Sequence, residues 1–238
     1  MHPIFIDTET TDTSENARLV QLAYKNSDTG EVVDELFKPP VPISVGAMAV
    51  HHITNEMVQD KRSFEMSEHR EKIRELLRNN ILVAHNARFD ISILSNEGVE
   101  TEQYIDTLRV SRHVIDSEQY SLQYLRYELG LTIGENVHAH DALGDILVLE
   151  KLYYHLSDSM KGKYSLSSDK EVLLKMVELT HLPVLLDEFK FGKYKGERFK
   201  DIATEDPGYI QWLYDSETKK PKSEQNEDLV YTLKNYLV

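Results

Sequence analysis

Two carboxylates lie close together near the amino terminus, where the apolar residues 4–6 lead directly into Asp7 and Glu9. The apolar run predicts a strand, and because side chains on a strand alternate between its faces, both acids point to the same side. Like charges at this spacing repel each other unless a cation neutralises them or one carboxylate takes up a proton. The pair therefore indicates a metal site, although a lone Asp-x-Glu is also compatible with acids that begin a solvated turn.

A third acid, Asp90, follows the apolar segment 81–84, which predicts a buried strand. His85 and Asn86 form the expected turn, and residues 87–94 the following helix, with Asp90 in its first turns. Sites in α/β sheets are usually built beside the carboxyl ends of the strands, which is where Asp90 is expected. Taken alone, this segment would indicate that Asp90 and Arg88 are ordinary charges on a helix surface.

The last candidates are Asp145 and His140. Leucine and isoleucine residues between 143 and 152 follow helical spacing, which predicts a helix with Asp145 near its start. His140 precedes this helix, so its imidazole could approach a water molecule held near the acids. His138 is the alternative for this role.

In chain order, the segments IDTET, AHNARFD and HAHDALGD resemble the DEDDh branch of the 3′ to 5′ exonuclease superfamily, which includes DNA polymerase III epsilon and ribonuclease T. In that branch a histidine stands five residues before the last aspartate, and His140 and Asp145 have this spacing. The sister branch has a tyrosine four residues before the aspartate, where this chain has Asp141. Residues 42–58 and 189–213 resemble the exodeoxyribonuclease X subfamily, so the similarity extends almost to the carboxyl end.

The resemblance implies that Asp7, Glu9, Asp90 and Asp145 hold two Mg²⁺ or Mn²⁺ ions, with His140 as the general base. Carboxylates supply the oxygen ligands that these hard cations prefer. Two such ions about 4 Å apart can activate a water molecule and stabilise charge on the attacking and leaving oxygens of a phosphodiester. An imidazole, with an ordinary pKa of about 6.5, can accept the proton of that water near neutral pH. The implied activity is hydrolysis of DNA 3′ ends to nucleoside 5′-monophosphates, in DNA repair.

The resemblance also indicates which residues contact the substrate in the exonuclease domain. They are Thr8, Thr10, Met48, His51, His52 and Phe89. The backbone of the two threonines should lie near the terminal nucleotide, the methionine and the histidines resemble a pocket for the 3′ end, and the phenylalanine could stack on a base. Core packing is the alternative for Met48 and Phe89, and a surface position at a helix end is the alternative for the histidines.

A basic stretch lies near the carboxyl end. Residues 189–200 contain five lysine or arginine residues and one glutamate, a net charge of +4. Lys193 and Lys195 stand between two glycines, and neighbouring aromatic residues could stack on the bases of a single strand. We therefore expect both lysines to contact nucleic acid, although a solvated loop would have the same composition. Trp212 is expected in the core of the small domain that contains this stretch.

Composition is that of an ordinary globular protein: 238 residues, of which 40% are hydrophobic and 29% charged, with no cysteine. No apolar run approaches the roughly 20 residues that a membrane helix needs, and no export signal is visible, so we expect no membrane contact and a cytoplasmic location. The net charge of −14 opposes nonspecific nucleic-acid binding, which usually relies on lysine and arginine. Any positive surface must therefore be local.

The order of the elements predicts an α/β fold, a ribonuclease H-like mixed sheet with helices on both faces and a small C-terminal α/β or α+β domain. Strands are expected at 3–7, 18–25, 31–37, 81–84 and 103–106. The exonuclease domain is expected at 1–156, a linker with a short helix at 157–182, and the small domain, with its proposed nucleic-acid contacts, at 183–238. Asp106 is expected to cap a helix.

Two other functions fit parts of the same pattern. The five site residues do not distinguish deoxyribose from ribose, so an exoribonuclease acting on RNA ends is the nearest alternative. A non-catalytic nucleic-acid-binding or polymerase-associated module is the other, and the intact set of acids and histidine argues against it.

Overall fold

The computed structural model describes residues 1–133 and 142–237. The chain forms two compact units, Met1–Thr180 and His181–Val238, each with its own core. None of the helices in the described ranges is long and apolar enough to cross a membrane.

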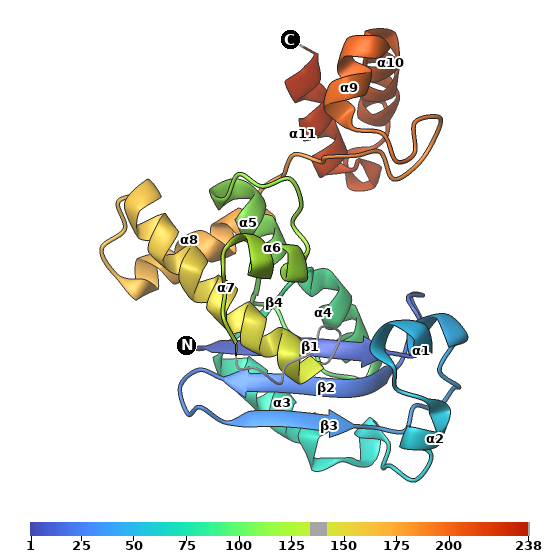
Figure 1. The fold of residues 1–238 in the computed structure, drawn as a ribbon, viewed down its shortest axis with the longest axis vertical. Helices are drawn as coiled ribbons and strands as arrows, with labels where there is room; N and C mark the ends of the chain where they lie inside the picture. Colours follow the sequence, from blue (N-terminus) through green and yellow to red (C-terminus); the bar gives the residue numbers. More distant parts are fainter. Residues whose placement is uncertain (134–141, 238) are drawn as a thin grey trace. The chain divides into compact units, whose positions relative to one another are not determined.

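A five-stranded mixed sheet with the strand order β3-β2-β1-β4-β5 is the centre of the first unit (Figure 1). The strands are β1 Pro3–Thr10, β2 Leu19–Asn26, β3 Val32–Leu36, β4 Ile81–Ala84 and β5 Tyr104–Asp106. β1, β2 and β3 pair antiparallel, whereas β4 runs parallel to both β1 and β5. The predicted strands and the ribonuclease H-like mixed sheet are confirmed.

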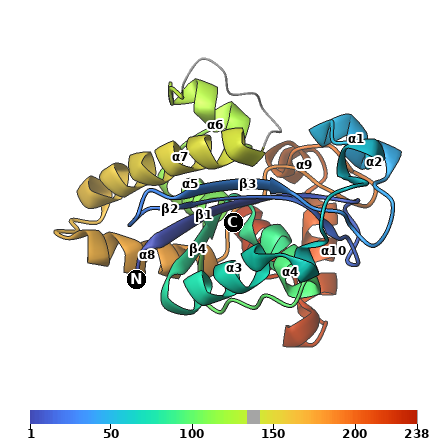
Figure 2. The same cartoon turned by 90° about the horizontal axis from the view of Figure 1, so that it is seen from below.

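Helices cover both faces of this sheet. The helices of the first unit are α1 Val45–His51, α2 Asn55–Val58, α3 Glu68–Asn79, α4 Ala87–Asn96, α5 Thr107–Val114, α6 Leu122–Glu128, α7 Ala142–Lys163 and α8 Asp169–His181, with a short 3₁₀ turn at Phe64–Met66. Figure 2 shows α7 on one face and α3 and α4 on the other. The sheet is therefore the middle of three layers.

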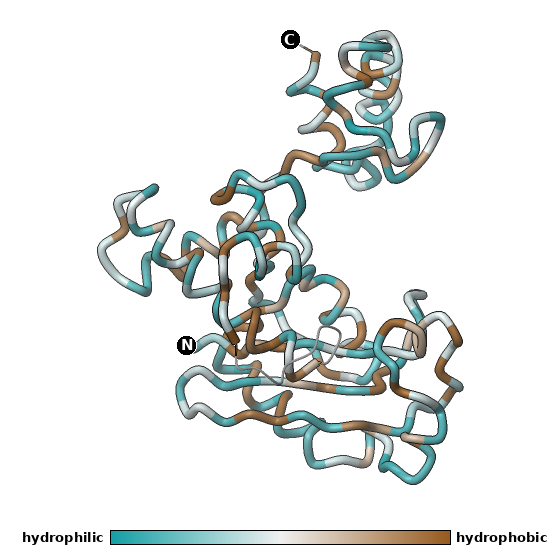
Figure 3. The backbone as a smooth tube through the Cα atoms, viewed as in Figure 1, coloured by the Kyte–Doolittle hydropathy of each residue, from teal (hydrophilic) through white to brown (hydrophobic). Residues whose placement is uncertain are grey.

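Two apolar cores result from the alternation of side chains along the central strands. Phe5 packs in the core on the α7 face, whereas Ile4 and Ile6 pack in the core on the α3 and α4 face. β4 is buried on both faces and appears as a continuous hydrophobic stretch in Figure 3. The same alternation assigns Asp7 and Glu9 to the α7 face, as their sequence spacing predicts.

The segment 157–182, expected to be a linker with a short helix, contains that helix as α8, and the rest of it is largely the continuation of α7. α7 continues to Lys163, and Met160 extends its buried stripe. From α8, Val172, Met176 and Leu179 enter the same core. Among the residues that indicated a linker, Ser165, Ser167 and Ser168 lie in the exposed connection between these two helices, whereas Asp158, Ser159 and Lys170 lie on their exposed sides.

The second unit is helical. It contains α9 Phe199–Glu205, α10 Pro207–Thr218 and α11 Glu227–Tyr236, with a 3₁₀ turn at Lys222–Glu224. Its core consists of Phe189, Phe199, Ile202, Ile210, Leu213, Leu229 and Leu233. The expected α/β or α+β character is reduced, within the described residues, to a single antiparallel bridge between Glu188 and Arg198.

Candidate active site

The acidic pair occupies the last part of β1. Asp7 lies opposite Ala23 and Glu9 opposite Gln21 in the ladder with β2, and the register shifts directly after Glu9. Thr8 is buried, whereas Asp7 and Glu9 are only partly buried, as expected for side chains on opposite faces of one strand. The strand thus presents two carboxylates together on the face that α7 covers.

Asp90 lies in the first turn of α4 and is almost completely buried, with 4% of its surface exposed. The Thr8 hydroxyl donates a hydrogen bond to Asp90 Oδ1 at 2.8 Å, which joins β1 to α4. Burial raises the pKa of Asp90 to about 7, and the Asp106 charge adds to this effect while the Thr8 hydrogen bond opposes it. A carboxyl group in this position gains most from a cation brought next to it.

A second buried carboxylate, Asp106, fixes the start of α4. Its Oδ1 accepts a hydrogen bond from the Leu108 N–H at 3.0 Å, which confirms the predicted cap of α5. The same oxygen accepts a hydrogen bond from the Asn86 N–H at 3.0 Å. Asn86 has a left-handed φ of 74° and directly precedes α4, so this contact holds the turn that orients Asp90.

His85 extends this support toward α5 and α6. Its Nε2 lies 2.7 Å from the Tyr120 carbonyl oxygen, and because a carbonyl only accepts, Nε2 carries a proton and donates it. Its Nδ1 lies 2.9 Å from the Thr107 hydroxyl. His85 therefore connects the turn between β4 and α4 to Thr107 at the start of α5 and to Tyr120, which precedes α6.

Asp145 lies near the start of α7, with 9% of its surface exposed. Gln123 Nε2 of α6 donates a hydrogen bond to Asp145 Oδ1 at 2.5 Å. Its helix packs on β1 and β2, and Ile146 shares a core with Phe5. Sequence reasoning did not single out Gln123, because nothing in its local pattern marks a partner 22 residues away.

The expected general base, His140, lies outside the described residues, as does its alternative His138. The role of His140, which its spacing from Asp145 favours over His138, therefore stays a prediction from the sequence.

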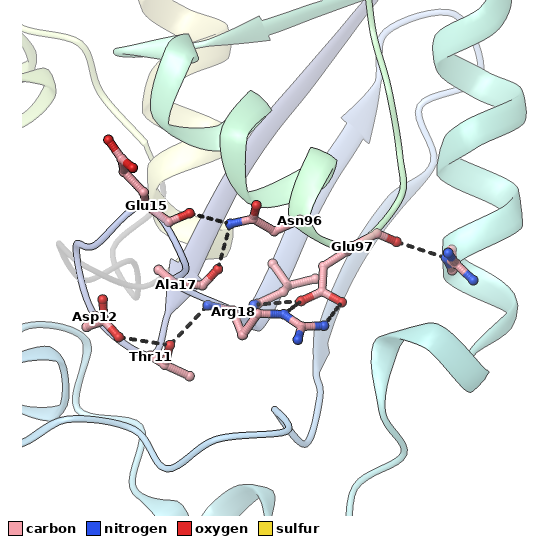
Figure 4. A network of polar contacts seen from close by, with 9 residues as sticks. Thr11, Asp12, Glu15, Ala17, Arg18, Asn96 and Glu97 are labelled. Atoms are coloured by element: carbon pink, nitrogen blue, oxygen red, sulfur yellow. Dashed lines mark hydrogen bonds and ion pairs between the residues drawn. The ribbon is translucent and has the colours of Figure 1, made fainter.

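The connection from β1 to β2 is fastened to the end of α4 (Figure 4). Arg18 donates to Glu97 through Nε at 2.7 Å and through Nη2 at 2.9 Å, a two-point ion pair. Asn96 Nδ2 donates to the carbonyl oxygens of Glu15 at 2.9 Å and Ala17 at 3.0 Å. These contacts and the Thr8–Asp90 hydrogen bond fix the acid-bearing strand and the Asp90 helix to each other at two points.

The described residues contain no group of three or more carboxylate or imidazole side chains already arranged around a common metal position. Asp90 and Asp145 accept hydrogen bonds from Thr8 and Gln123. The donor set nevertheless suits a hard divalent cation, because carboxylates offer only oxygen ligands and Asp90 is buried with a raised pKa. A carboxylate has about four acceptor positions, so these hydrogen bonds are compatible with a bound ion.

A cavity of about 380 Å³ lies beside Glu9, and its volume is within the size range of small-ligand sites. Glu9, Thr10, His51 and Phe89 line it, together with residues of α1 and of the loop after β1. Residues from three separate stretches of the chain, all predicted to contact substrate or metal, thus meet at one opening. Phe89 also packs against the core on the α4 face, which was the alternative to base stacking, and its stacking on a base stays a prediction.

His51 is bound within the protein through both ring nitrogens. Its Nδ1 accepts a hydrogen bond from the Ile53 N–H at 3.0 Å, so Nε2 carries the proton and donates to the Thr10 carbonyl oxygen at 3.1 Å. Burial lowers its pKa, which favours this neutral form. His51 therefore joins α1 to the end of β1 and offers the cavity its ring surface.

Met48 and His52 do not line this cavity. Met48 packs beside the small core of Val20, Ile43, Ile53 and Val58, and His52 is the exposed residue that ends α1 with a φ of 61°. Their contact with substrate stays a prediction.

Lys193 and Lys195 lie in the second unit. Both lysines are exposed. Lys193 Nζ is 4.5 Å from the centre of the Tyr194 ring and 3.3 Å from Asp206 Oδ2. Trp212 is 60% exposed, so the expectation that it fills the core was wrong. Phe189 and Phe199, stacked with ring centres 3.8 Å apart, occupy that core instead.

A mixed sheet covered on both faces, with acids on its central strand and on two flanking helices, is the framework that the resemblance to the exonuclease superfamily predicted. Residues 4–153 match the family described as Exonuclease, and residues 189–217 match the Exodeoxyribonuclease X-like C-terminal family. The chain belongs to the exonuclease family.

Individual relatives agree with this assignment. Exodeoxyribonuclease 10 of Escherichia coli (strain K12) is 30% identical over 237 residues, covering 98% of this chain and 97% of that protein. DNA polymerase III subunit epsilon of Buchnera aphidicola subsp. Acyrthosiphon pisum is 28% identical over 191 residues, covering 71% of this chain and 77% of that one.

Solved structures share the fold. Exonuclease X in complex with 5′ overhanging duplex DNA superposes with a TM-score of 0.56 and 26% identity, covering 75% of this chain and 99% of that one. Escherichia coli Exonuclease I in complex with a dA16 oligonucleotide, 18% identical, gives a TM-score of 0.54 over 73% of this chain and 42% of that one.

Proposed function

We propose that this exonuclease is a metal-dependent 3′ to 5′ exodeoxyribonuclease that releases nucleoside 5′-monophosphates and acts in DNA repair. The observation that carries the proposal is the buried Asp90, which the Thr8 hydroxyl holds beside the strand that bears Asp7 and Glu9. A buried carboxyl group with a raised pKa suits a centre that receives cations.

The four carboxylates of Asp7, Glu9, Asp90 and Asp145 are the proposed ligands of two Mg²⁺ or Mn²⁺ ions. When bound, these ions would neutralise the acids and the scissile phosphate and favour ionisation of the attacking water. The backbone of Thr8 and Thr10 and the wall of the adjoining cavity hold the terminal nucleotide, with Phe89 against its base. His140 accepts the proton of the attacking water, as its spacing from Asp145 suggests.

DNA is the proposed substrate because two similar proteins are named or described for it. The relative that this chain matches over 97% of its length is named an exodeoxyribonuclease, and the Exonuclease X structure holds duplex DNA. The experiment must exclude RNA as the preferred substrate, because carboxylates that bind a phosphate do not sense the 2′-hydroxyl.

The test is a time course on matched DNA and RNA oligonucleotides labelled at the 5′ end, with Mg²⁺, Mn²⁺ or EDTA. We expect DNA to shorten from its 3′ end, with 5′-monophosphates as products, and EDTA to stop the reaction. Asp145→Ala should be inactive, whereas Glu15→Gln, an exposed acid in the loop after β1, should retain wild-type activity. Faster hydrolysis of RNA, shortening from the 5′ end, or full activity in EDTA would each contradict the proposal.

A further inference from the structure

The second unit exposes an indole on the side of α10. Ile210 and Leu213 form the buried side of this helix, and Trp212 points away from them with 60% of its surface exposed. Trp212 is the single tryptophan of the chain. An isolated exposed apolar side chain needs no explanation, so the neighbours of this one decide whether it belongs to a site.

Those neighbours form a continuous series of aromatic rings that begins in the core. The Tyr209 ring centre lies 5.9 Å from Phe189, which is fully buried, and 4.9 Å from Tyr194. It lies 5.5 Å from Trp212, with the two rings tilted by 35°. The exposed indole therefore rests on a ring that the core holds in place, which limits its freedom before any ligand arrives.

A glycine-bounded loop packs against the same tyrosine. Gly192 has a φ of 71°, and a Cβ there would lie 2.9 Å from the Tyr209 hydroxyl. Gly196, with a φ of 93°, donates its N–H to the Phe189 carbonyl oxygen at 2.8 Å. The loop is thus fitted closely to the aromatic series, and it presents Phe191, which is 43% exposed, beside Gly192.

Some of the lysine and arginine side chains in and beside this loop form ion pairs, and others do not. Lys190 is paired with Glu188, and Lys193 lies 3.3 Å from Asp206, which also accepts a hydrogen bond from the Tyr194 hydroxyl. Lys195, Arg198 and Lys200 are exposed and form no ion pair with a described residue. Lys195 therefore leaves an available cation in the loop whose Tyr194 ring packs on Tyr209, in a chain whose net charge is −14.

We propose that this face, defined by Phe191, Lys195, Tyr209 and Trp212, binds single-stranded nucleic acid, with a base stacked on the indole and a phosphate near Lys195. Exposed rings and available cations are the two components of single-strand binding, because every base has a π-face and every linkage a charge. A duplex hides its base faces and would leave the indole unused. The inference takes only the ligand class, nucleic acid, from the proposed function. It does not require the protein to be catalytically active.

The test uses the fluorescence of the sole tryptophan in the full-length protein, with EDTA to prevent turnover. Titration with a 20-nucleotide deoxythymidine oligonucleotide should quench the emission in a saturable way, and a hairpin duplex of the same charge should quench it much less. Trp212→Ala should weaken binding, measured by anisotropy of a labelled oligonucleotide, by about 5- to 150-fold, the usual range for loss of one stacked base. Trp212→Phe should restore most of the affinity.

Lys195→Ala should reduce the slope of log affinity against log salt by about 0.7, the value for one phosphate contact on a single strand. The matched controls are Tyr231→Ala and Lys234→Ala, an exposed aromatic residue and an exposed cation on α11, and both should bind like the wild type. Equal losses in the control variants would indicate a general surface effect and contradict the proposed face.

Emission unchanged by saturating oligonucleotide would overturn the inference. So would a spectral shift that depends on protein concentration alone, because a second copy of the chain would then cover the indole. Hydrolysis assays separate this result from the proposed function. Normal hydrolysis without quenching refutes the face only, whereas quenching in a protein that hydrolyses neither DNA nor RNA refutes only the catalytic proposal.

Discussion

Replacing Asp90 by asparagine should stabilise the metal-free protein while abolishing its activity. Burial raises the pKa of Asp90 from its ordinary value of 3.8 to about 7 in the folded chain. The folded state therefore binds a proton more tightly than the unfolded state, and folding loses stability as the pH rises from about 4 to about 7. Asparagine keeps the shape of the side chain and an oxygen that can accept the Thr8 hydrogen bond, but it has no charge to desolvate.

The size of this stabilisation follows from the shift in the pKa of Asp90. A difference of about 3 pKa units, at 1.36 kcal/mol per unit, corresponds to about 4 kcal/mol at pH 8 and to almost nothing at pH 4. For a protein of this length, a gain of that size should raise the midpoint of thermal unfolding by about 8–16 °C. The comparison is most direct in EDTA, where no cation compensates the charge.

The assay is thermal unfolding followed by circular dichroism at pH 4, 5, 6, 7 and 8, with the exposed-acid variant Asp60→Asn as control. The advantage of Asp90→Asn over the wild type should appear only as the pH rises, and Asp60→Asn should show none. Adding Mg²⁺ at pH 8 should stabilise the wild type more than Asp90→Asn. A variant less stable than the wild type at every pH would refute the reasoning, because it would mean that the Asp90 charge is already compensated inside the fold.

Three further predictions concern catalysis and the stability of the fold around the site. Asp7→Ala and Asp145→Ala should each abolish hydrolysis without loss of helical circular dichroism, as EDTA should, while Glu15→Gln stays active; residual activity in the alanine variants would count against their proposed role. His140→Ala should slow single-turnover hydrolysis by about 10² to 10⁴ with little change in the Mg²⁺ concentration for half-maximal rate. Glu97→Gln, which breaks the ion pair with Arg18, should lower the free energy of unfolding in urea by about 1–3 kcal/mol, and an unchanged midpoint would show that the contact is solvated.

Sequence patterns predicted the parts of this fold that depend on local geometry. Asp7 and Glu9 share a face because the side-chain period of a strand is two, and Asp106 caps α5 because its carboxylate reaches the N–H of Leu108 two residues on. The family spacing of His140 and Asp145 supplied the rest of the candidate set. These signals need only a few consecutive residues.

Long-range contacts could not be predicted in this way. Gln123 and Asp145 are 22 residues apart, and Arg18 and Glu97 are 79 apart, so neither contact leaves a local signal in the sequence. The exposure of Trp212 could not be predicted from local sequence either. Its side chain was expected inside because a small domain needs large apolar residues, yet Phe189 and Phe199 already fill that volume.

The partners of the acids also explain how the site can keep its charge for a cation. Thr8 and Gln123, which donate to Asp90 and Asp145, are neutral. A lysine or arginine in either place would neutralise the carboxylate and compete with a divalent ion, whereas a hydroxyl or amide fixes an oxygen without cancelling its charge. The ion pairs that secure the surrounding elements, Arg18 with Glu97 and Lys25 with Glu150, use acids outside the proposed metal set. Because these two ion pairs use Glu97 and Glu150, cation binding at the proposed metal set would leave both of them intact.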